Sequence, residues 1–316
     1  GRREIAQAQV LLQRVLPSPL AVAEGRGEST HLEILPLHGE LSLAEQQAAL
    51  APAEANTRRI VLATNVAESS ITLPGIRAVI DSGLAREPRF DPNSGFTRLE
   101  TVTISQASAD QRAGRAGRVA AGTTYRLWPQ SRRLESVRSA EISQAELSGL
   151  ALELAAWGVT ADSTAGLAWL DPPPAGALAQ ARELLRALEA LADDGRITAL
   201  GRSMLDLGAT PRLGAAALRA AESRRALVAD LLALMEARSP LRGAQARSDD
   251  FRARVAALHA WRDRRGGSPR GEADSGALAA IEQASKGWRR RLDIRSAASG
   301  MPDSHAVGDL LAHAFP

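Results

Sequence analysis

The stretch Gln111-Arg112-Ala113-Gly114-Arg115-Ala116-Gly117-Arg118 carries the strongest local signal in this chain of 316 residues. Two glycines within a helical pattern each cost about 1 kcal/mol relative to alanine, so they indicate a close backbone approach or an irregular helix end. Gln111, Arg115 and Arg118 stand at i, i+4 and i+7, which places them on one face of one helix. Such a face suits a polyphosphate, since guanidinium groups match phosphate oxygens and are always charged. The alternative is a solvated basic face, and the paired glycines and the leading glutamine argue against it.

A second polar segment reads Ala63-Thr64-Asn65-Val66-Ala67-Glu68-Ser69-Ser70-Ile71-Thr72-Leu73-Pro74-Gly75-Ile76. It begins at the carboxyl end of an expected strand, Arg59–Ala63, which is where ligands bind in open α/β sheets. Hydroxyl and amide side chains are dense in it: Thr64, Asn65, Ser69, Ser70 and Thr72. Such side chains hold a nucleic-acid backbone without reading its sequence. Taken alone, the segment is explained equally well by ordinary loop and cap chemistry.

Around these segments, the first half of the chain alternates helix and strand patterns. Helices are expected at Arg2–Leu16 and from Ser42, an N-cap with Glu45 three residues later, to about Leu50. The expected short apolar strands are His31–Leu37, Arg59–Ala63, Ala78–Ile80 and Gly122–Trp128. A β-hairpin is expected from Arg86–Phe90, the turn Asp91–Gly95 and Thr97–Ile104. Strands alternating with helices favour a parallel sheet with helices on both faces.

The pattern changes after about Pro129 and becomes mainly helical. The expected elements are helices at Gln144–Trp157 and Ala177–Ala192, a turn at Asp193–Gly195 and a short strand at Arg196–Thr198. From Pro211 onward the pattern is all helical, with breaks at Ser239-Pro240 and Gly266–Pro269. The second half is therefore expected to pack helices around a core of its own.

Composition excludes some classes of protein and leaves others open. The chain has no cysteine, which excludes a disulfide framework, a thiolate nucleophile and a cysteine-ligated zinc site. Its five histidines show no metal-ligand spacing, so no metal site is expected. Residues 211–316 carry 18 basic against 12 acidic side chains, which makes them a candidate polyanion contact or, more plainly, a solvated arginine-rich surface. No apolar run has the length of a membrane span, so no membrane contact and a cytoplasmic location are expected.

Taken together, four stretches resemble motifs IV, V and VI in the second RecA-like domain of DEAH-box RNA helicases. They are Leu37–Leu41, Ala63–Ile76, Ile80–Gly83 and Gln111–Arg118. Later stretches are similar to the winged-helix domain and the start of the helical bundle of that family: Glu141-Ile142, Leu147–Leu150, Glu153-Leu154, Trp169–Pro173 and Gly201-Arg202. The bacterial HrpB branch is the most similar. The resemblance implies an α/β RecA-like parallel-sheet domain at residues 1–138, a winged helix at 139–209 and an all-α helical bundle at 210–316.

The resemblance also implies roles for individual side chains. Gln111, Arg115 and Arg118 would face the γ-phosphate of ATP, with the two arginines as fingers, and Ser82 and Gly83 would complete the nucleotide side. The residues implied for RNA binding are Thr64, Asn65, Thr72, Gly39, Arg86 and Arg89, the last two on a hairpin that acts as a wedge. A cleft-facing Arg115 is expected to bury little apolar area and so to matter little for folding.

Two motifs of the family do not occur in this sequence, the G-x-x-x-x-G-K-[ST] loop and the Asp-Glu-Ala-His box. The resemblance places both in a first RecA-like domain upstream, which would hold most of the ATP and Mg²⁺. This chain alone is therefore expected to hydrolyse no ATP. The intact protein is expected to be an ATP-dependent 3′-to-5′ RNA helicase or RNP remodeller, a monomer that binds single-stranded RNA. A non-catalytic RNA-binding or adaptor module and a DNA-directed helicase are the alternatives.

Two positions depart from the family pattern. Pro74 stands where many members have an aspartate near the nucleotide ribose, and Leu50 where many have a phenylalanine that stacks on adenine. Both changes weaken contacts to adenosine. We therefore expect loose specificity for the nucleotide base.

Overall fold

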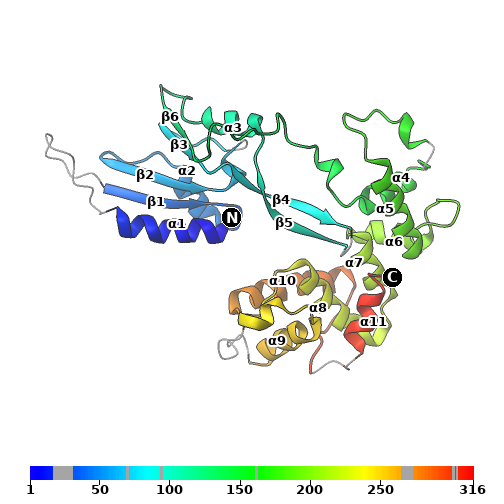
Figure 1. The fold of residues 1–316 in the computed structure, drawn as a ribbon. Coiled ribbons are helices and arrows are strands. Elements are labelled where there is room, and N and C mark those ends of the chain that lie inside the picture. The colour runs from blue at the N-terminus through cyan, green and yellow to red at the C-terminus, as the bar shows by residue number, and fades with distance from the viewer. Residues whose placement is uncertain are drawn as a thin grey trace, which may run out of the picture. The chain divides into compact units, whose positions relative to one another are not determined.

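The computed structural model describes residues 1–16, 31–68, 71–92, 95–160, 163–264, 273–300, 303 and 305–316. It divides into two compact units, unit 1 (Gly1–Ala145) and unit 2 (Glu146–Pro316) (Figure 1). Some predicted features lie outside the described residues: Ser69 and Ser70, Asn93 and Ser94 of the hairpin turn, and the break at Gly266–Pro269.

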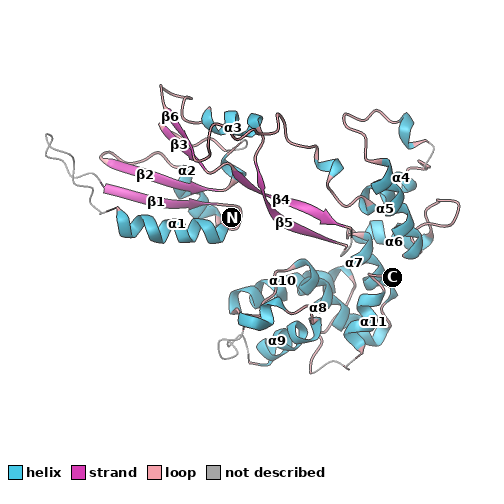
Figure 2. Ribbon diagram, viewed as in Figure 1, coloured by secondary structure: helices cyan, strands magenta, loops and turns pink. Residues whose placement is uncertain are grey.

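Unit 1 contains all the strands of the described part of the chain (Figure 2). Its elements are α1 (Arg2–Val15), β1 (His31–Leu37), α2 (Leu43–Leu50), β2 (Thr57–Ala63), the 3₁₀ turn η1 (Asn65–Ala67), β3 (Ala78–Asp81), β4 (Leu84–Asp91), β5 (Phe96–Thr103), α3 (Gln106–Ala113), β6 (Thr123–Arg126) and the 3₁₀ turn η2 (Glu141–Ser143). β1 pairs in parallel with β2, and β3 pairs in parallel with β6. The predicted parallel strands are confirmed. They form two separate pairs, because no described strand is hydrogen-bonded to both β2 and β3.

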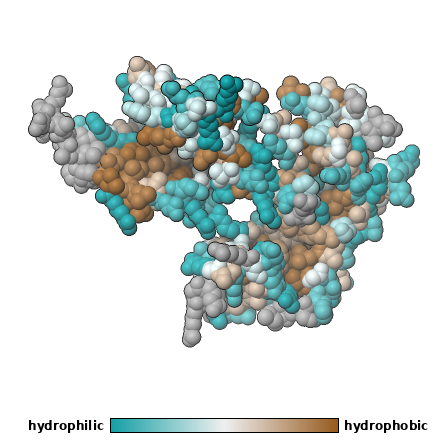
Figure 3. Space-filling model, viewed as in Figure 1, coloured by the Kyte–Doolittle hydropathy of each residue, from teal (hydrophilic) through white to brown (hydrophobic). Residues whose placement is uncertain are grey.

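Local sequence signals explain where the helices of unit 1 begin and how they dock. Ser42 and Glu45 form the predicted capping box: the Glu45 amide donates to Ser42 Oγ at 3.3 Å, and the Ser42 amide donates to Glu45 Oε2 at 2.8 Å. α1 buries Ile5 and packs on β1 and β2, whereas α3 contacts β3. α1 also exposes Val10 and Val15, and Figure 3 shows a brown area over this part of unit 1. The apolar stripe of α1 is thus only partly used within the unit.

The predicted β-hairpin is confirmed as the antiparallel pair β4–β5, with a register that runs from Leu84 opposite Thr103 to Asp91 opposite Phe96. Gly95 adopts φ +69°, a left-handed conformation that glycine accepts without strain. The register places Arg89 opposite Arg98. The next pair on the same face is Glu87 opposite Glu100, so this face of the hairpin carries two arginines and two glutamates.

The arginine-rich stretch is not one helix, contrary to the expectation above. α3 ends at Ala113, the Gly114 amide donates to the Asp110 carbonyl, and turns follow through Gly117. Because the helix stops between Gln111 and Arg115, these side chains do not share a helical face. Of the two explanations for the paired glycines, a close backbone approach or an irregular helix end, the structure supports the irregular helix end.

The regular elements in the described part of unit 2 are all helices. Its elements are α4 (Ser148–Ala156), η3 (Thr164–Gly166), α5 (Ala175–Ala187), α6 (Ala199–Leu207), α7 (Pro211–Arg219), η4 (Glu222–Arg224), α8 (Arg225–Glu236), η5 (Gly243–Arg247), α9 (Phe251–Asp263), α10 (Ser275–Arg291) and α11 (Ala306–Ala312). α8 contacts α7, α9, α10 and α11. Leu231, Leu232 and Leu234 of α8 are almost completely buried. This helix is the centre of the unit's core.

Two expectations for unit 2 are corrected. The strand expected at Arg196–Thr198 is a single antiparallel bridge between Leu191 and Ile197, because the chain turns back at once into α6. The helix expected from Gln144 begins at Ser148, after η2. The boundary between the units, after Ala145, lies near the predicted boundary after residue 138. The division of the remainder at residue 209 stays a prediction.

The core of unit 2 encloses a cluster of charged side chains around Asp230, which is completely buried. Arg262 donates to both carboxylate oxygens of Asp230, at 2.5 and 2.6 Å, and Ser285 Oγ donates at 2.5 Å. His259 lies 2.9 Å from Asp230 through Nε2 and 2.6 Å from the Gly300 carbonyl through Nδ1. Burial opposes a charge on His259, but these contacts and the charge of Asp230 outweigh it and raise the pKa of His259. Both ring nitrogens face acceptors, an arrangement that favours the imidazolium form of His259.

Candidate functional site

Arg115 and Arg118 both contact the polar segment that follows β2. Arg115 donates through Nε to the Glu68 carbonyl at 3.0 Å and through Nη1 to the Ile71 carbonyl at 2.6 Å, and its Nη2 also donates to the Glu68 carbonyl. Arg118 donates through Nη1 to Thr72 Oγ1 at 3.0 Å. The pKa of Arg115 is lowered, mainly by burial and secondarily by the like charge of Arg118. The negative charge of Glu68 acts in the opposite direction and raises it. The two arginines thus meet the segment that contains Thr72.

The other residues expected on the nucleotide side lie apart from this contact. Gln111 is exposed at the end of α3. Ser82 is exposed and accepts a weak bond from the Leu84 amide at 3.4 Å. Gly83 is buried and has φ +73°, and a Cβ built on it would lie 2.7 Å from Cε3 of Trp128. The left-handed backbone and the packing against Trp128 both account for glycine at position 83.

Three of the expected RNA-binding residues lie at one edge of the β1–β2 pair. The last pair in the register of β1 and β2 is Leu37 with Ala63. Gly39 follows the end of β1, and Thr64 and Asn65 follow the end of β2, so all three lie at the same end of the strand pair. The Thr64 amide donates to the Leu37 carbonyl at 3.1 Å, and Thr64 Oγ1 caps η1 by accepting from the Val66 amide. The structure therefore brings these residues together as polar groups at the carboxyl ends of two parallel strands.

Arg86 and Arg89 lie on β4 of the hairpin. Arg86 is exposed and donates through Nη2 to the Leu99 carbonyl at 3.0 Å across the hairpin. Arg89 lies with Nε 4.0 Å from Glu100 Oε2, and this nitrogen has no hydrogen-bond partner. The Nε atom of Arg89 is thus a buried donor without a hydrogen-bond partner among the described residues.

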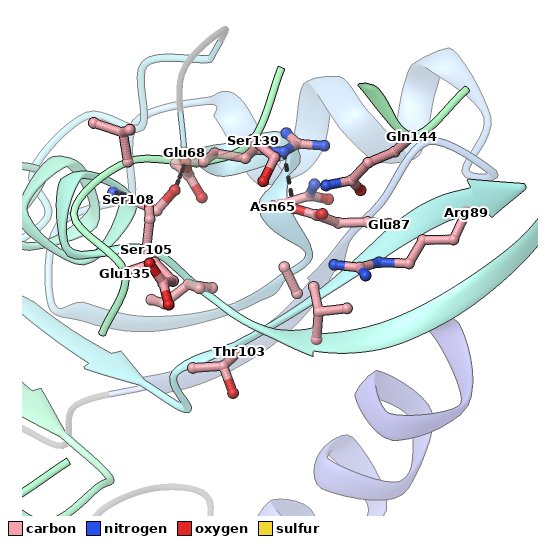
Figure 4. A pocket seen from close by; sticks show the side chains of 15 residues that line it. Asn65, Glu68, Glu87, Arg89, Thr103, Ser105, Ser108, Glu135, Ser139 and Gln144 are labelled. Atoms are coloured by element: carbon pink, nitrogen blue, oxygen red, sulfur yellow. Dashed lines mark hydrogen bonds and ion pairs between the residues drawn. The ribbon is translucent and has the colours of Figure 1, made fainter. Parts of the chain in front are cut away.

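A cavity of about 100 Å³ connects the hairpin to the segment after β2 (Figure 4). Asn65 and Glu68 line it from the segment, Glu87 and Arg89 from the hairpin, and Ser108 from α3. Figure 4 shows the side chains of Glu68 and Ser108 pointing toward one another. The segment after β2, the hairpin and α3 thus share one polar pocket.

Sequence reasoning missed Glu68, Asp81 and Arg112, which hold the site together. Arg112 donates through Nε to Glu68 Oε2 and through Nη1 to Asp81 Oδ1, both at 2.9 Å. These partners lie 44 and 31 residues from Arg112 in the chain, so no local pattern pairs them. The available signal was an acidic residue in the otherwise uncharged stretch Thr64–Ile76.

Neither a membrane span nor a metal centre is found among the residues that the structure describes. None of the described helices has the length and apolarity needed to cross a membrane. No group of three or more histidine and carboxylate side chains, searched over the same residues, could hold a metal ion.

Two family models match the chain. The helicase conserved C-terminal domain matches residues 18–120, and the winged-helix helicase associated domain (HA2) matches residues 181–208. The first match contains the whole segment after β2 and the whole arginine-rich stretch. The second covers the end of α5 and all of α6, which supports the predicted winged helix in this region.

Individual relatives give longer matches. The chain is 39% identical over 284 residues to the ATP-dependent RNA helicase HrpB of Escherichia coli (strain K12), a match that covers 89% of this chain and 32% of HrpB. It is 41% identical over 185 residues to the pre-mRNA-splicing factor ATP-dependent RNA helicase prp22 of Schizosaccharomyces pombe, which covers 58% of this chain and 16% of the relative. The chain thus spans a third or less of the length of these relatives.

Solved structures agree with the sequence matches. The crystal structure of the Escherichia coli DEAH/RHA helicase HrpB aligns with 100% of this chain and 35% of its own, at a TM-score of 0.77 and 34% identity. A second crystal structure, of the E. coli DExH-box NTPase HrpB, aligns with 100% of this chain and 34% of its own, at a TM-score of 0.72 and 35% identity. The chain therefore belongs to the HrpB-like DEAH-box helicases and carries the conserved C-terminal helicase domain and the helicase-associated winged-helix region of that family.

Proposed function

We propose that this chain is the part of an ATP-dependent RNA helicase or RNP remodeller that supplies the arginine fingers and the RNA-backbone contacts. The observation that carries the proposal is the direct contact of Arg115 and Arg118 with the segment Glu68–Thr72. Arginines suited to a transferring phosphate are bonded to a segment suited to a nucleic-acid backbone. Binding or hydrolysis of the nucleotide would therefore alter the contacts to the nucleic acid, and binding of the nucleic acid would alter the contacts to the nucleotide.

On the nucleotide side, Arg115 and Arg118 would stabilise the charge that develops on the transferred γ-phosphoryl group. Gln111 would orient the attacking water, and Ser82 and Gly83 would border the nucleotide. ATP and Mg²⁺ would be held mainly by a first RecA-like domain of the same protein. No residue of this chain is assigned to the metal.

On the RNA side, Gly39, Thr64, Asn65 and Thr72 would contact phosphate and sugar, because hydroxyl, amide and backbone groups bind these without reading sequence. Arg86 and Arg89 would add charge from the hairpin, which would act as a wedge. The partner would be single-stranded RNA, the direction of movement 3′ to 5′, and the protein a cytoplasmic monomer. The relatives that support RNA as the substrate are named RNA helicases.

The test uses the intact protein and its Arg118→Ala variant. ATP hydrolysis is measured without nucleic acid, with poly(rA) and with poly(dA), and unwinding is measured on duplexes with a 3′ or a 5′ single-stranded overhang. The proposal predicts stimulation by poly(rA), unwinding from the 3′ overhang and loss of both in the variant. Equal or greater stimulation by poly(dA) would support a DNA-directed helicase, and RNA binding without hydrolysis would support an adaptor module.

A further inference from the structure

The Glu68 carboxylate joins the segment after β2 to α3. Its Oε1 accepts from Ser108 Oγ at 2.8 Å, and its Oε2 accepts from Arg112 Nε at 2.9 Å. Ser108 and Arg112 are four residues apart on α3 and so lie on one face of that helix. The Glu68 side chain is 18% exposed and that of Arg112 is 14% exposed, so the ion pair is largely shielded from water. Each carboxylate oxygen thus has its own partner on the same helix.

Arg112 extends this connection to β3. Its Nη1 donates to Asp81 Oδ1 at 2.9 Å and to the Leu84 carbonyl at 3.2 Å, and the Asp81 side chain is only 2% exposed. Arg112 therefore holds carboxylates from two different strand ends. Charged hydrogen bonds of this kind are stronger and more directional than neutral ones, so α3 is fixed in position relative to Glu68.

The Glu68 residue also holds Arg115, but through its backbone. Arg115 Nε donates to the Glu68 carbonyl at 3.0 Å, and Nη2 donates to the same oxygen. A closed loop of contacts results: the Glu68 side chain binds α3, and the turn that follows α3 returns Arg115 to the Glu68 carbonyl. The Arg115 guanidinium is thus connected to Glu68 through both the side chain and the backbone of that residue, with the Ile71 carbonyl as a further acceptor.

We propose that Glu68 is the positioning residue of the arginine finger Arg115, an assignment that rests on the proposed function. Glu68 touches neither nucleotide nor RNA in this role. It sets the place from which Arg115 reaches the transferring phosphate, and it links that place to the segment that contains Thr72. Loss of the carboxylate misplaces Arg115 without removing it.

The expected effects follow from which contacts each substitution keeps. Glu68→Ala removes both contacts to α3, and a misplacement of about 1 Å near the chemistry costs on the order of 10²-fold in rate. We expect kcat for RNA-stimulated ATP hydrolysis to fall by roughly 10- to 100-fold, with KM for ATP nearly unchanged, because a finger acts on transition-state charge. Glu68→Gln keeps an acceptor for Arg112 and turns a donor toward Ser108, whose hydroxyl also accepts. It should therefore restore most of the rate.

The experiment measures kcat, KM and the thermal midpoint of the intact protein with poly(rA). The variants are Glu68→Ala, Glu68→Gln, Arg115→Lys and the double variant Glu68→Ala with Arg115→Lys. Glu33→Ala is the matched control, since Glu33 forms an ion pair of similar length with Arg59, at 2.8 Å, between β1 and β2 of the same unit. If Glu68 acts through Arg115, Glu68→Ala should lower kcat only slightly further in a protein that already carries Arg115→Lys. If the two residues acted independently, the double variant would show the product of the two single fold-changes in kcat. The control should keep the parent kcat.

The outcomes distinguish failure of the proposed helicase function from failure of the positioning role of Glu68. Parent protein without RNA-stimulated hydrolysis would overturn the proposed function and this assignment with it. An active parent together with an equally active Glu68→Ala variant would overturn the assignment alone. The assignment would also fail if Glu68→Ala lowered kcat by the same factor in both backgrounds, or if Glu33→Ala lowered kcat as much.

Discussion

Replacing Arg115 separates a structural role from a chemical one. Arg115→Ala removes three hydrogen bonds to the Glu68 and Ile71 carbonyls, which the sequence-based expectation of a side chain unimportant for folding did not include. Hydrogen bonds with one charged partner contribute about 1.5–3 kcal/mol each when buried, but this site is partly exposed and water can reach the carbonyls. We expect a loss of about 2 kcal/mol in the free energy of unfolding of unit 1, or roughly 6 °C in Tm.

The expected effect of Arg115 on catalysis is larger than its effect on stability, and it depends on the planar guanidinium group. Arginine fingers contribute about 10³–10⁵-fold to turnover, which corresponds to roughly 4–7 kcal/mol in the activation free energy. Arg115→Lys keeps the charge and one donor for a carbonyl, so most of the stability should remain. It loses the two-pronged contact to phosphate, so the ATPase activity should still collapse.

The assays are thermal unfolding of the 316-residue chain and RNA-stimulated ATP hydrolysis by the intact protein, with Arg58→Ala as a control at an exposed arginine of β2. RNA affinity without nucleotide should change little in Arg115→Lys. If Arg115→Lys hydrolyses ATP at the parent rate, Arg115 is only a structural residue and the finger assignment is refuted.

Three further predictions concern other parts of the molecule. The raised pKa of His259 means that its contribution to stability is complete below about pH 6.5 and is lost as the pH rises through its folded pKa. The Tm of unit 2 should therefore fall as the pH is raised above about 6.5, and His259→Asn should remove that part of the slope. Gly83→Ala should lower the Tm of unit 1, because the new Cβ would lie 2.7 Å from the Trp128 ring, whereas Gly117→Ala, with no atom within 4 Å of its Cβ, should be close to neutral; equal effects would contradict the packing argument. The resemblance places Pro74 and Leu50 where the family contacts adenosine, and weaker contacts there predict that the intact protein hydrolyses GTP, CTP and UTP at rates within roughly tenfold of ATP. Strict preference for ATP would show that other residues read the base.

Elements with a local signal could be predicted from the sequence. α1, the Ser42 cap and the β4–β5 hairpin each depend on residues within one turn or one pair of strands, and the structure confirms all three. The parallel strands were also predicted, because short apolar runs between helices allow few other arrangements. The winged-helix region was predicted from its resemblance to the family, and the family match supports it.

The contacts that organise the site could not be predicted in the same way. The glycines of the arginine-rich stretch fit either a close approach or a helix end, and only the backbone at Gly114 decides between them. Glu68 meets Ser108 and Arg112 across 40 and 44 residues, so the pairing is a property of the fold. The same holds for Asp230 and His259, which are 29 residues apart, although a lone aspartate in the apolar helix α8 was a visible sign of a buried partner.

The central claim is that this chain completes a phosphoryl-transfer site whose phosphate-binding loop lies elsewhere in the protein. The most direct measurement compares ATP turnover by the purified 316-residue chain with turnover by the intact protein, each with and without single-stranded RNA. Arginine fingers do not replace the loop amides, the lysine and the magnesium ligands, so the chain alone should show no turnover, whereas the intact protein should show turnover that RNA increases. Turnover by the chain alone that survives replacement of both Arg115 and Arg118 would contradict the account.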